Sequence, residues 1–403
     1  MCASSSGMRE TLQVVSSMEK LIYQGSTDEE NRVRAALKEA TNSIVSTVGS
    51  RGLDAVVLAG GFGRGEGALL REDGSEGLPF NDFDFLLVGT RSSVPVRVLS
   101  KLKRMLPRVL NVDFVDINYM RASDFKRVSP TVFFYELRNA NRVLWGSPDA
   151  LGTLPFFDPS ELPLTEATRL FLNRGLGLLS VLLQLDDAQS GELVGRRAAV
   201  AWSKVVLTAG DSFLLERKLY HWSYVERMKR LAEIAQFSAL EAEFAETYLR
   251  AAMFKLTADF SLLPTQDPSK LCYEARQIHE RYFRTLERKR TFADLTDWKA
   301  YPTVVLRAGL QPLRRRLKEY LTERGDMVAR FRSLWRFARL PLWNEERRLA
   351  ILPLLLYAVL EPGSQAREGS YVAEACEIEY GRRDVRADDW KRLALELVGE
   401  FHP

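Results

Sequence analysis

Two aspartates separated by a single residue mark the stretch of the sequence whose side chains most clearly suit a chemical role. The segment NDFDFLLV, residues 81–88, places Asp82 and Asp84 at the start of an apolar run. In a β-strand, residues two apart point to the same side, so the two carboxylates would stand together while Phe83 and Phe85 point to the other side. Adjacent anions repel each other unless a cation lies between them, and magnesium prefers oxygen ligands of this kind. The pair therefore indicates a metal site at a strand end, and the alternative is that it only solubilises that end.

A glycine-rich stretch precedes this pair. VVLAGGFGRGEGALL, residues 56–70, runs from a strand-like segment into Gly60, Gly61 and Gly63, directly followed by Arg64. Glycines have no Cβ atom, so backbone N–H groups approach phosphate oxygens closely, and Arg64 would add a positive charge. The stretch matches neither the Walker pattern nor the dinucleotide-binding fingerprint. It indicates a phosphate-binding loop, with a turn that binds nothing as the alternative.

A third acid follows in NVDFVDIN, residues 111–118. Either Asp113 or Asp116 would stand beside the aspartate pair if the two strands are neighbours. The two residues point to opposite faces of such a strand, so the alternation alone does not choose between them.

The elements that must hold these residues alternate between helix and strand. Apolar residues recur at helical spacing over residues 28–49, with acidic residues in the first turn. Strand-like runs at 54–59, 83–88 and 109–117 alternate with the glycine loop and with a helical pattern at 96–106. This alternation predicts an α/β fold for the N-terminal part of the chain.

The character of the sequence changes near residue 164. From there, apolar residues recur at spacings of three and four, and β-branched clusters are scarce, which predicts helices to the C-terminus. The prolines and turn residues of FFDPSELP, residues 156–163, indicate a boundary near residue 160. We expect N-terminal helices over 1–50, an α/β domain over 51–158 and an all-α domain over 159–403.

Composition narrows the class of protein. The 403 residues are 46% hydrophobic and 27% charged, which is typical of a globular protein and argues against disorder. Cys2, Cys272 and Cys376 are far apart, so they indicate neither a disulfide framework nor a metal cluster, and they fit a cytoplasmic location. No secretion signal is visible, and LAILPLLLYAVL, residues 349–360, is too short for a membrane span and predicts a buried helix.

The order of the three motifs resembles the polymerase-β-like nucleotidyltransferase superfamily. Its members have an apolar strand, Gly-Gly or Gly-Ser, an Asp-x-Asp pair on a second strand and a third acid on a later one. LAGGFGRGEG, NDFDFLLV and VDFVDIN follow that order, and RVLWGSPDAL, residues 142–151, is similar to the strand that often closes the minimal domain. The resemblance covers roughly residues 50–150 and implies a mixed sheet with helices, followed by a helical domain.

The resemblance also implies roles for single residues. Asp82 and Asp84 would bind two magnesium ions, and Asp113 would be the third carboxylate because it occupies the family's position. The phosphates of an NTP such as ATP would meet the loop residues Gly60, Gly61, Gly63 and Arg64. Twenty residues separate Gly61 from Asp82, about twice the family's usual spacing, and residues 69–80 look like an insert beside the site.

The helical half adds further candidates. Lys204 and Asp211 are seven residues apart and would share one helix face, where the lysine would meet a triphosphate, and Tyr224 would stack on a base. A solvated ion pair is the alternative for Lys204 and Asp211. We expect His221 to be a surface or half-buried residue rather than a general base.

Residues 307–348 are rich in arginine with interleaved aromatics. The segment suits either a nucleic-acid track or, as we favour, a helical hairpin with its arginines in solvent. The sequence thus predicts a magnesium-dependent nucleotidyltransferase that moves an NMP from an NTP to an acceptor hydroxyl and releases pyrophosphate. A small-molecule or protein acceptor is preferred to an RNA end, and the alternatives are an RNA-end or tRNA nucleotidyltransferase and a catalytically silent nucleotide-binding protein.

Overall fold

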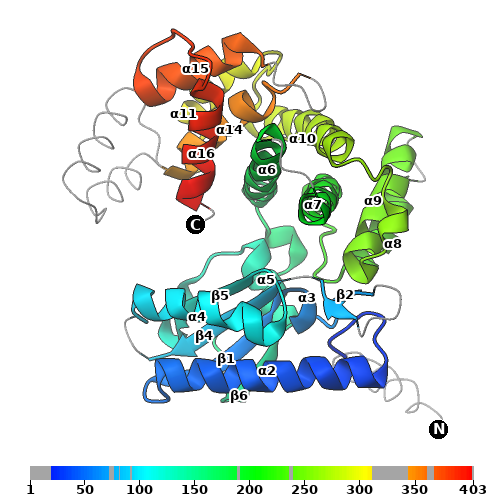
Figure 1. Cartoon of the computed structure of the whole chain (residues 1–403), viewed down its shortest axis with the longest axis vertical. Coiled ribbons are helices and arrows are strands. Elements are labelled where there is room, and N and C mark those ends of the chain that lie inside the picture. The colour runs from blue at the N-terminus through cyan, green and yellow to red at the C-terminus, as the bar shows by residue number, and fades with distance from the viewer. Residues whose placement is uncertain are drawn as a thin grey trace. The chain divides into compact units, whose positions relative to one another are not determined.

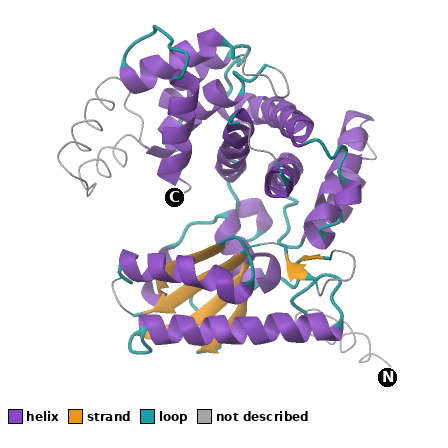
Figure 2. Ribbon diagram, viewed as in Figure 1, coloured by secondary structure: helices purple, strands orange, loops and turns teal. Residues whose placement is uncertain are grey.

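The chain folds into two compact units, each made of two separate stretches of sequence. Unit 1 comprises Met1–Pro163 and Leu214–Leu262, and unit 2 comprises Leu164–Phe213 and Leu263–Pro403. The computed structural model describes residues 20–71, 77–80, 82–90, 93–187, 191–235, 239–310, 344–360 and 367–401. All described strands lie before residue 147, and every described element after them is helical (Figures 1 and 2). The predicted order of an α/β part followed by a helical part is confirmed at this level.

Unit 1 is built on a four-stranded sheet in the order β5-β4-β1-β6. The strands are β1 (Leu53–Ala59), β4 (Phe83–Gly89), β5 (Val115–Arg121) and β6 (Arg142–Gly146). Strands β4 and β5 are parallel, whereas β1 runs antiparallel to both β4 and β6. The sheet is therefore mixed, as the resemblance implied.

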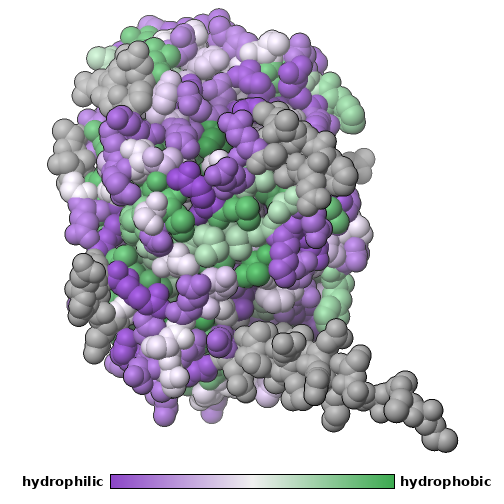
Figure 3. Space-filling view, turned by 90° about the vertical axis from the view of Figure 1, so that its right-hand side faces the viewer, coloured by the Kyte–Doolittle hydropathy of each residue, from purple (hydrophilic) through white to green (hydrophobic). Residues whose placement is uncertain are grey.

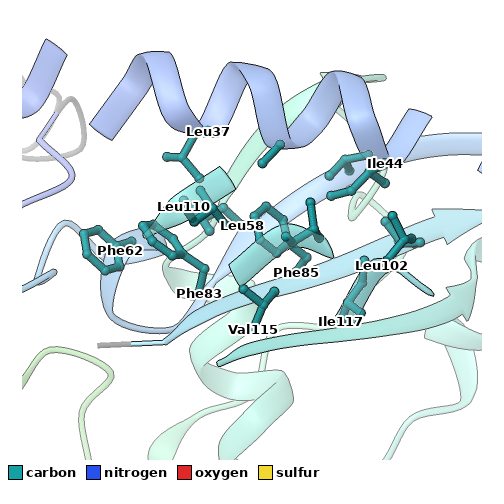
Figure 4. Close-up of a cluster of buried hydrophobic side chains, with 14 of the residues drawn as sticks. Leu37, Ile44, Leu58, Phe62, Phe83, Phe85, Leu102, Leu110, Val115 and Ile117 are labelled. Carbon is teal, nitrogen blue, oxygen red and sulfur yellow. The ribbon is translucent and has the colours of Figure 1, made fainter. Parts of the chain in front are cut away.

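Two helices cover one face of this sheet, as Figure 4 shows for the side chains between them. They are α2 (Thr27–Val48), which begins with a capping box between Ser26 and Glu29, and α4 (Val96–Leu110). Apolar residues three and four apart on both helices contact every second residue of the strands. The helical period and the strand period of the sequence therefore both mark residues that are buried in this one core. This core comprises among others Leu37, Ile44, Leu102, Leu110, Phe83, Phe85, Val115 and Ile117.

The opposite face of the sheet is apolar at one end and acidic at the other. Its apolar part is covered by Phe125 of η1 (Ala122–Arg127) and Leu137 of α5 (Val132–Asn139). Along β4, Leu86 and Val88 belong to this apolar part. Because side chains alternate, Asp84 lies on the same face as Leu86, at the end where the apolar cover stops.

Strand β5 differs from the sequence-based prediction of a strand over 109–117. Val109 and Leu110 still belong to α4, because Leu102, Leu106 and Leu110 continue its buried stripe. Asn111 then ends the helix in the left-handed conformation, with φ of 52°. The strand consequently begins only at Val115.

The glycine loop and the insert also acquire structure. Gly60–Gly63 form one helical turn, α3, directly after β1. The insert at 69–80 forms a short hairpin of β2 (Leu69–Leu70) and β3 (Leu78–Pro79), and residues 72–76 lie outside the described residues. Arg71 beside the hairpin donates to Glu29 at the start of α2, and this hydrogen bond lowers the pKa of Glu29 to about 2.

Part of the helical half belongs to unit 1. Helices α8 (Tyr224–Ala235) and α9 (Ala239–Thr257) pack on each other and are followed by η3 (Phe260–Leu262). Phe80, at the end of the insert, makes edge contacts with Phe254 of α9 and Phe260 of η3, with ring centroids 5.6 and 5.8 Å apart. We name α8, α9 and η3 the helical arm.

Unit 2 is helical in its described residues. Its elements are α6 (Thr165–Asp186), α7 (Glu192–Glu216) up to Phe213, α10 (Pro268–Thr291), η4 (Trp298–Ala300), α11 (Tyr301–Ala308), α14 (Asn344–Leu356), α15 (Gly369–Tyr380) and α16 (Asp389–Phe401). The apolar run at 349–360 lies in and just after α14, and its residues 349–352 and 354–359 are at most 4% exposed, whereas Leu360 is 42% exposed. The predicted buried helix is confirmed up to Leu356. Residues 311–343 of the basic segment lie outside the described residues.

One described helix, α7, is long and apolar enough to cross a membrane by length and composition. Its most apolar window is 83% buried inside the structure, and core helices of folded proteins pass the same test, so this is weak evidence for a span.

On the face shown in Figure 3, hydrophobic residues gather near the middle and hydrophilic residues surround them.

Candidate active site

Three aspartates share the acidic end of the sheet in unit 1. Asp84 pairs in register with Asp116 on the parallel neighbour β5 and with Ala59 on β1. Directly opposite residues on neighbouring strands point to the same face, and Asp82 precedes Asp84 by two residues. Asp82, Asp84 and Asp116 therefore project from one patch.

The protonation of Asp84 reflects this crowding. Burial, and next the negative charges of Asp82 and Asp116, raise the pKa of Asp84 to about 7. The charges of Lys255 and Arg64 oppose that rise. Asp84 is thus a half-buried carboxyl group within electrostatic reach of two other carboxylates and two cations.

Asp113, our sequence-based choice for the third carboxylate, lies elsewhere. It is exposed and stands two residues before β5 begins. Its strand neighbours in sequence, Val115 and Ile117, face the core under α2 and α4. The register thus brings Asp116, not Asp113, beside Asp84, because Asp113 is in the alternation with Val115 and Ile117, which face the opposite side of the sheet. Asp116 is therefore the acid that stands beside Asp84, and the role of a third carboxylate stays a prediction.

The glycine turn lies against Asp84. Gly60 has a φ of +64°, and a Cβ atom on it would lie 1.8 Å from Oδ2 of Asp84. Gly63 is also confined, since its Cβ would lie 2.6 Å from the carbonyl oxygen of Leu58. Gly61 has ordinary space, with the nearest atom, the carbonyl oxygen of Glu66, at 3.6 Å. The sequence therefore needs glycine at Gly60 to bring the turn onto the carboxylate.

Arg64 is held by carboxylates of unit 1. Its side chain is 6% exposed, its Nη1 donates to Glu136 of α5 at 2.8 Å, and its Nε donates to Glu66 at 3.3 Å. Although burial lowers the pKa of Arg64, the charges of Glu136 and Glu66 raise it above its usual value. The guanidinium predicted for phosphate binding is therefore already paired inside the protein.

Tyr224 belongs to the same surroundings as Arg64. The guanidinium of Arg64 lies 5.5 Å and that of Arg227 4.3 Å from the centre of its ring. Tyr224 therefore stacks on arginines, and its stacking on a base stays a prediction. His221, two residues before α8's capping Ser223, is half-buried, as expected.

Lys255 is a candidate that the sequence did not indicate. It lies in the last turn of α9, is half-buried, and its charge lowers the pKa of Asp84. No local motif marks it, because it reaches the aspartates only through the folding of the helical arm. Lys204 and Asp211 lie on α7 in unit 2, where Lys204 is half-buried and Asp211 is 4% exposed, so their place in a nucleotide site stays a prediction.

The donor chemistry of the patch fits magnesium, although no group of three His, Cys, Asp or Glu side chains among the described residues is close enough to hold a metal ion. Magnesium is commonly held by one or two carboxylates together with substrate phosphates and water. Asp82 and Asp84 supply two carboxylates on one face, and a cation between them would relieve the repulsion by which Asp82 and Asp116 contribute, after burial, to the raised pKa of Asp84. The residues present therefore suit an ion that arrives with a nucleotide.

Comparisons with known proteins add a distant structural likeness. No family model matches the sequence, and no curated protein matches it. Among solved structures, a spectinomycin adenyltransferase, AAD(9), from Enterococcus faecialis, with ATP and spectinomycin, aligns with 64% of this chain and 100% of its own, at 12% identity and a TM-score of 0.35. A likeness at this level carries no argument about this chain's activity.

Proposed function

We propose that unit 1 is the catalytic unit of a magnesium-dependent nucleotidyltransferase, which moves an NMP from an NTP to an acceptor hydroxyl. The observation that carries the proposal is the patch of Asp82, Asp84 and Asp116, with Gly60 packed on Asp84 and Lys255 within electrostatic reach. The order of motifs in the sequence supports the same activity.

Asp82 and Asp84 would hold magnesium together with the NTP phosphates. The bound metal would supply charge neutralisation and would align the attacking and leaving oxygens for an in-line displacement. The half-buried position of Asp84 favours this role, because a low-dielectric setting strengthens the attraction between its carboxylate and a cation.

Asp116 would serve the acceptor. Its carboxylate accepts a hydrogen bond from Asn118 at 3.0 Å and lies 3.5 Å from Nζ of Lys103, and its side chain is 38% exposed. It is thus open to solvent on a patch it shares with the metal-binding pair. In the proposed step Asp116 accepts the proton of the acceptor hydroxyl as that oxygen bonds to the α-phosphorus. The bond from the α-phosphorus to the bridging oxygen breaks, and pyrophosphate leaves.

Lys255 would neutralise charge on the phosphates. A lysine at the end of α9 is a mobile point charge on a flexible stem, suited to the pyrophosphate as negative charge develops on it. For the acceptor we propose a small molecule or a protein, because the net charge of +4 is modest for 403 residues.

The proposal is tested with NTPs that carry a radiolabel on either the α- or the γ-phosphate. The protein is incubated with each NTP, magnesium and fractions of a cell extract. We expect the α-label to enter one acceptor fraction and the γ-label to appear in pyrophosphate. With the Asp84→Asn variant we expect neither product. Entry of the γ-label into the acceptor would identify a phosphotransferase instead, and nucleotide binding without transfer would identify a silent binding protein.

A further inference from the structure

Two buried arginine side chains share one half-buried carboxylate beside the glycine turn. Glu136 of α5 accepts from Nη1 of Arg64 at 2.8 Å and also pairs with Nη2 of Arg227, whose side chain is 1% exposed. The hydroxyl of Tyr220 donates to the same carboxylate at 2.6 Å. Although burial raises the pKa of Glu136, the charges of Arg64 and Arg227 lower it below its usual value. Glu136 is therefore an ionised centre that joins the turn to the start of the helical arm.

A second carboxylate makes a parallel connection. Glu66, 5% exposed, accepts from Arg64 and also from the hydroxyl of Ser223 at 2.7 Å and the backbone N–H of Tyr224 at 2.9 Å. Ser223 and Tyr224 are the residues at which α8 begins. The first turn of α8 is thus tied to the loop that follows Gly60–Gly63.

The four groups balance each other in charge. Arg64 and Arg227 carry two positive charges, and Glu66 and Glu136 carry two negative charges in the same largely buried cluster. Buried charges are tolerated when they are paired and hydrogen-bonded, whereas the loss of one partner leaves a costly unpaired charge. We call Arg64, Glu66, Glu136 and Arg227 the charge clamp.

The clamp connects two parts of the candidate site. On one side it holds the turn whose Gly60 packs on Asp84. On the other side it holds α8, which packs on α9, and Lys255 lies in the last turn of α9. Phe80 fixes the far end of the arm through Phe254. The position of Lys255 relative to Asp84 thus depends on both attachments.

We propose that the charge clamp is a positioning device, in which Arg64 sets the Gly60 turn and the helical arm against Asp84 without touching the triphosphate. The inference rests on the proposed nucleotidyltransferase activity. It assigns Arg64 a positioning role in place of the role of a phosphate ligand. It also predicts that a second substitution which restores the neutrality of the cluster restores part of the activity.

The experiment compares Arg64→Gln, Glu136→Gln and the double variant, each assayed below its melting temperature. Each single variant leaves the cluster with an unbalanced charge, whereas the double variant is neutral again. We expect each single variant to lower kcat for label transfer about tenfold or more. In the double variant, the decrease in log kcat relative to wild type should be at most half of that in the single variants. The affinity for inorganic tripolyphosphate, measured with magnesium, should be similar in the two single variants Arg64→Gln and Glu136→Gln.

Two results would overturn the inference while leaving the proposed activity intact. If Arg64→Gln and the double variant bind tripolyphosphate equally weakly while Glu136→Gln binds it normally, Arg64 is a phosphate ligand. If all three variants keep the wild-type kcat and KM, the clamp is only structural. A wild-type protein that transfers no label would overturn the proposed function, and the inference with it.

Glu287→Gln provides a matched control for general destabilisation. Glu287 in unit 2 is fully buried and is held by Arg290, by the hydroxyl of Tyr301 at 2.6 Å and by that of Thr168 at 2.7 Å. It resembles Glu136 in having an arginine and a tyrosine partner. We expect Glu287→Gln to lower the melting temperature without lowering kcat, and an equal loss of kcat would count against the positioning role of Glu136.

Discussion

Gly60 and Asp84 approach each other so closely that no side chain fits between them. The Cβ of an alanine at position 60 would lie 1.8 Å from Oδ2 of Asp84, and its φ of +64° is strained for any residue with a Cβ. We expect Gly60→Ala to lower the free energy of unfolding by at least about 1 kcal/mol and to suppress transfer, because the carboxylate must move. Thermal unfolding and label transfer measure both effects.

Gly61→Ala is the control for this prediction. Its Cβ would meet nothing closer than 3.6 Å, so its stability should stay within about 0.5 kcal/mol of wild type. Full activity of Gly60→Ala would show that the position of Asp84 is not critical.

Replacing either aspartate of the pair by asparagine should reduce transfer to background. Asp82→Asn and Asp84→Asn each remove an anionic oxygen ligand and leave the side chain nearly the same size. Without metal, their melting temperatures should equal or slightly exceed that of wild type, because the charge of Asp82 raises the pKa of Asp84 and this repulsion is relieved. Normal turnover in either variant would contradict the metal-binding role.

The third carboxylate gives a comparison between two nearby residues. Asp116→Asn should lower kcat by about a hundredfold or more, because a general base typically contributes that much. Asp113→Asn should have little effect, since Asp113 is exposed and precedes the strand. Steady-state kinetics of the two variants decide the matter, and the opposite ranking would favour the assignment that the family resemblance implied.

Lys255 and Lys204 are competing candidates for contact with the phosphates. We expect Lys255→Met to raise the KM for the NTP about tenfold, the effect of losing a charged hydrogen bond, since Lys255 lies within electrostatic reach of Asp84. Lys229→Met, at a lysine of α8 that is 67% exposed, is the control for loss of charge. A larger effect of Lys204→Met than of Lys255→Met would instead support the sequence-based prediction.

His279 makes the stability of unit 2 depend on pH. Burial lowers the pKa of His279 to about 4, while its hydrogen bond to the carbonyl of Phe171 acts in the opposite direction. The unfolded chain binds this proton near pH 6.5, so the native state loses stability as the pH falls from about 6.5 to about 4, by roughly 3 kcal/mol in total. Urea unfolding followed across this range measures the loss. In His279→Gln the free energy of unfolding should depend less on pH across this range. An unchanged pH dependence would contradict the assignment of the effect to His279.

Local patterns predicted the elements of unit 1 better than the contacts between them. The alternation around Asp82 and Asp84 was sufficient to place β4, but the start of β5 was wrong, because Val109 and Leu110 suit a strand as well as the end of a helix. The assignment of Asp116 needed the register of two strands.

Residues joined only by tertiary packing could not be predicted. Glu136 pairs with an arginine 72 residues before it and with another 91 residues after it. Lys255 likewise comes near Asp84 through the packing of α8 and α9. No sequence period links such positions, whereas Gly60 and Asp84 were found because each belongs to a short motif.

The interleaving of the two units has a consequence for biosynthesis. The chain passes between the units three times, after Pro163, Phe213 and Leu262. On the ribosome, the strands of the sheet, Glu66 and Glu136 emerge well before Arg227 and Lys255, which follow a stretch of unit 2. A nascent chain that stops near residue 160 would therefore carry Glu66 and Glu136 with Arg64 but without Arg227, so the cluster would have an unbalanced negative charge, and we expect such a chain to need chaperones or to be degraded. Lys255 would reach the three aspartates only late in translation, after Leu262 has left the exit tunnel.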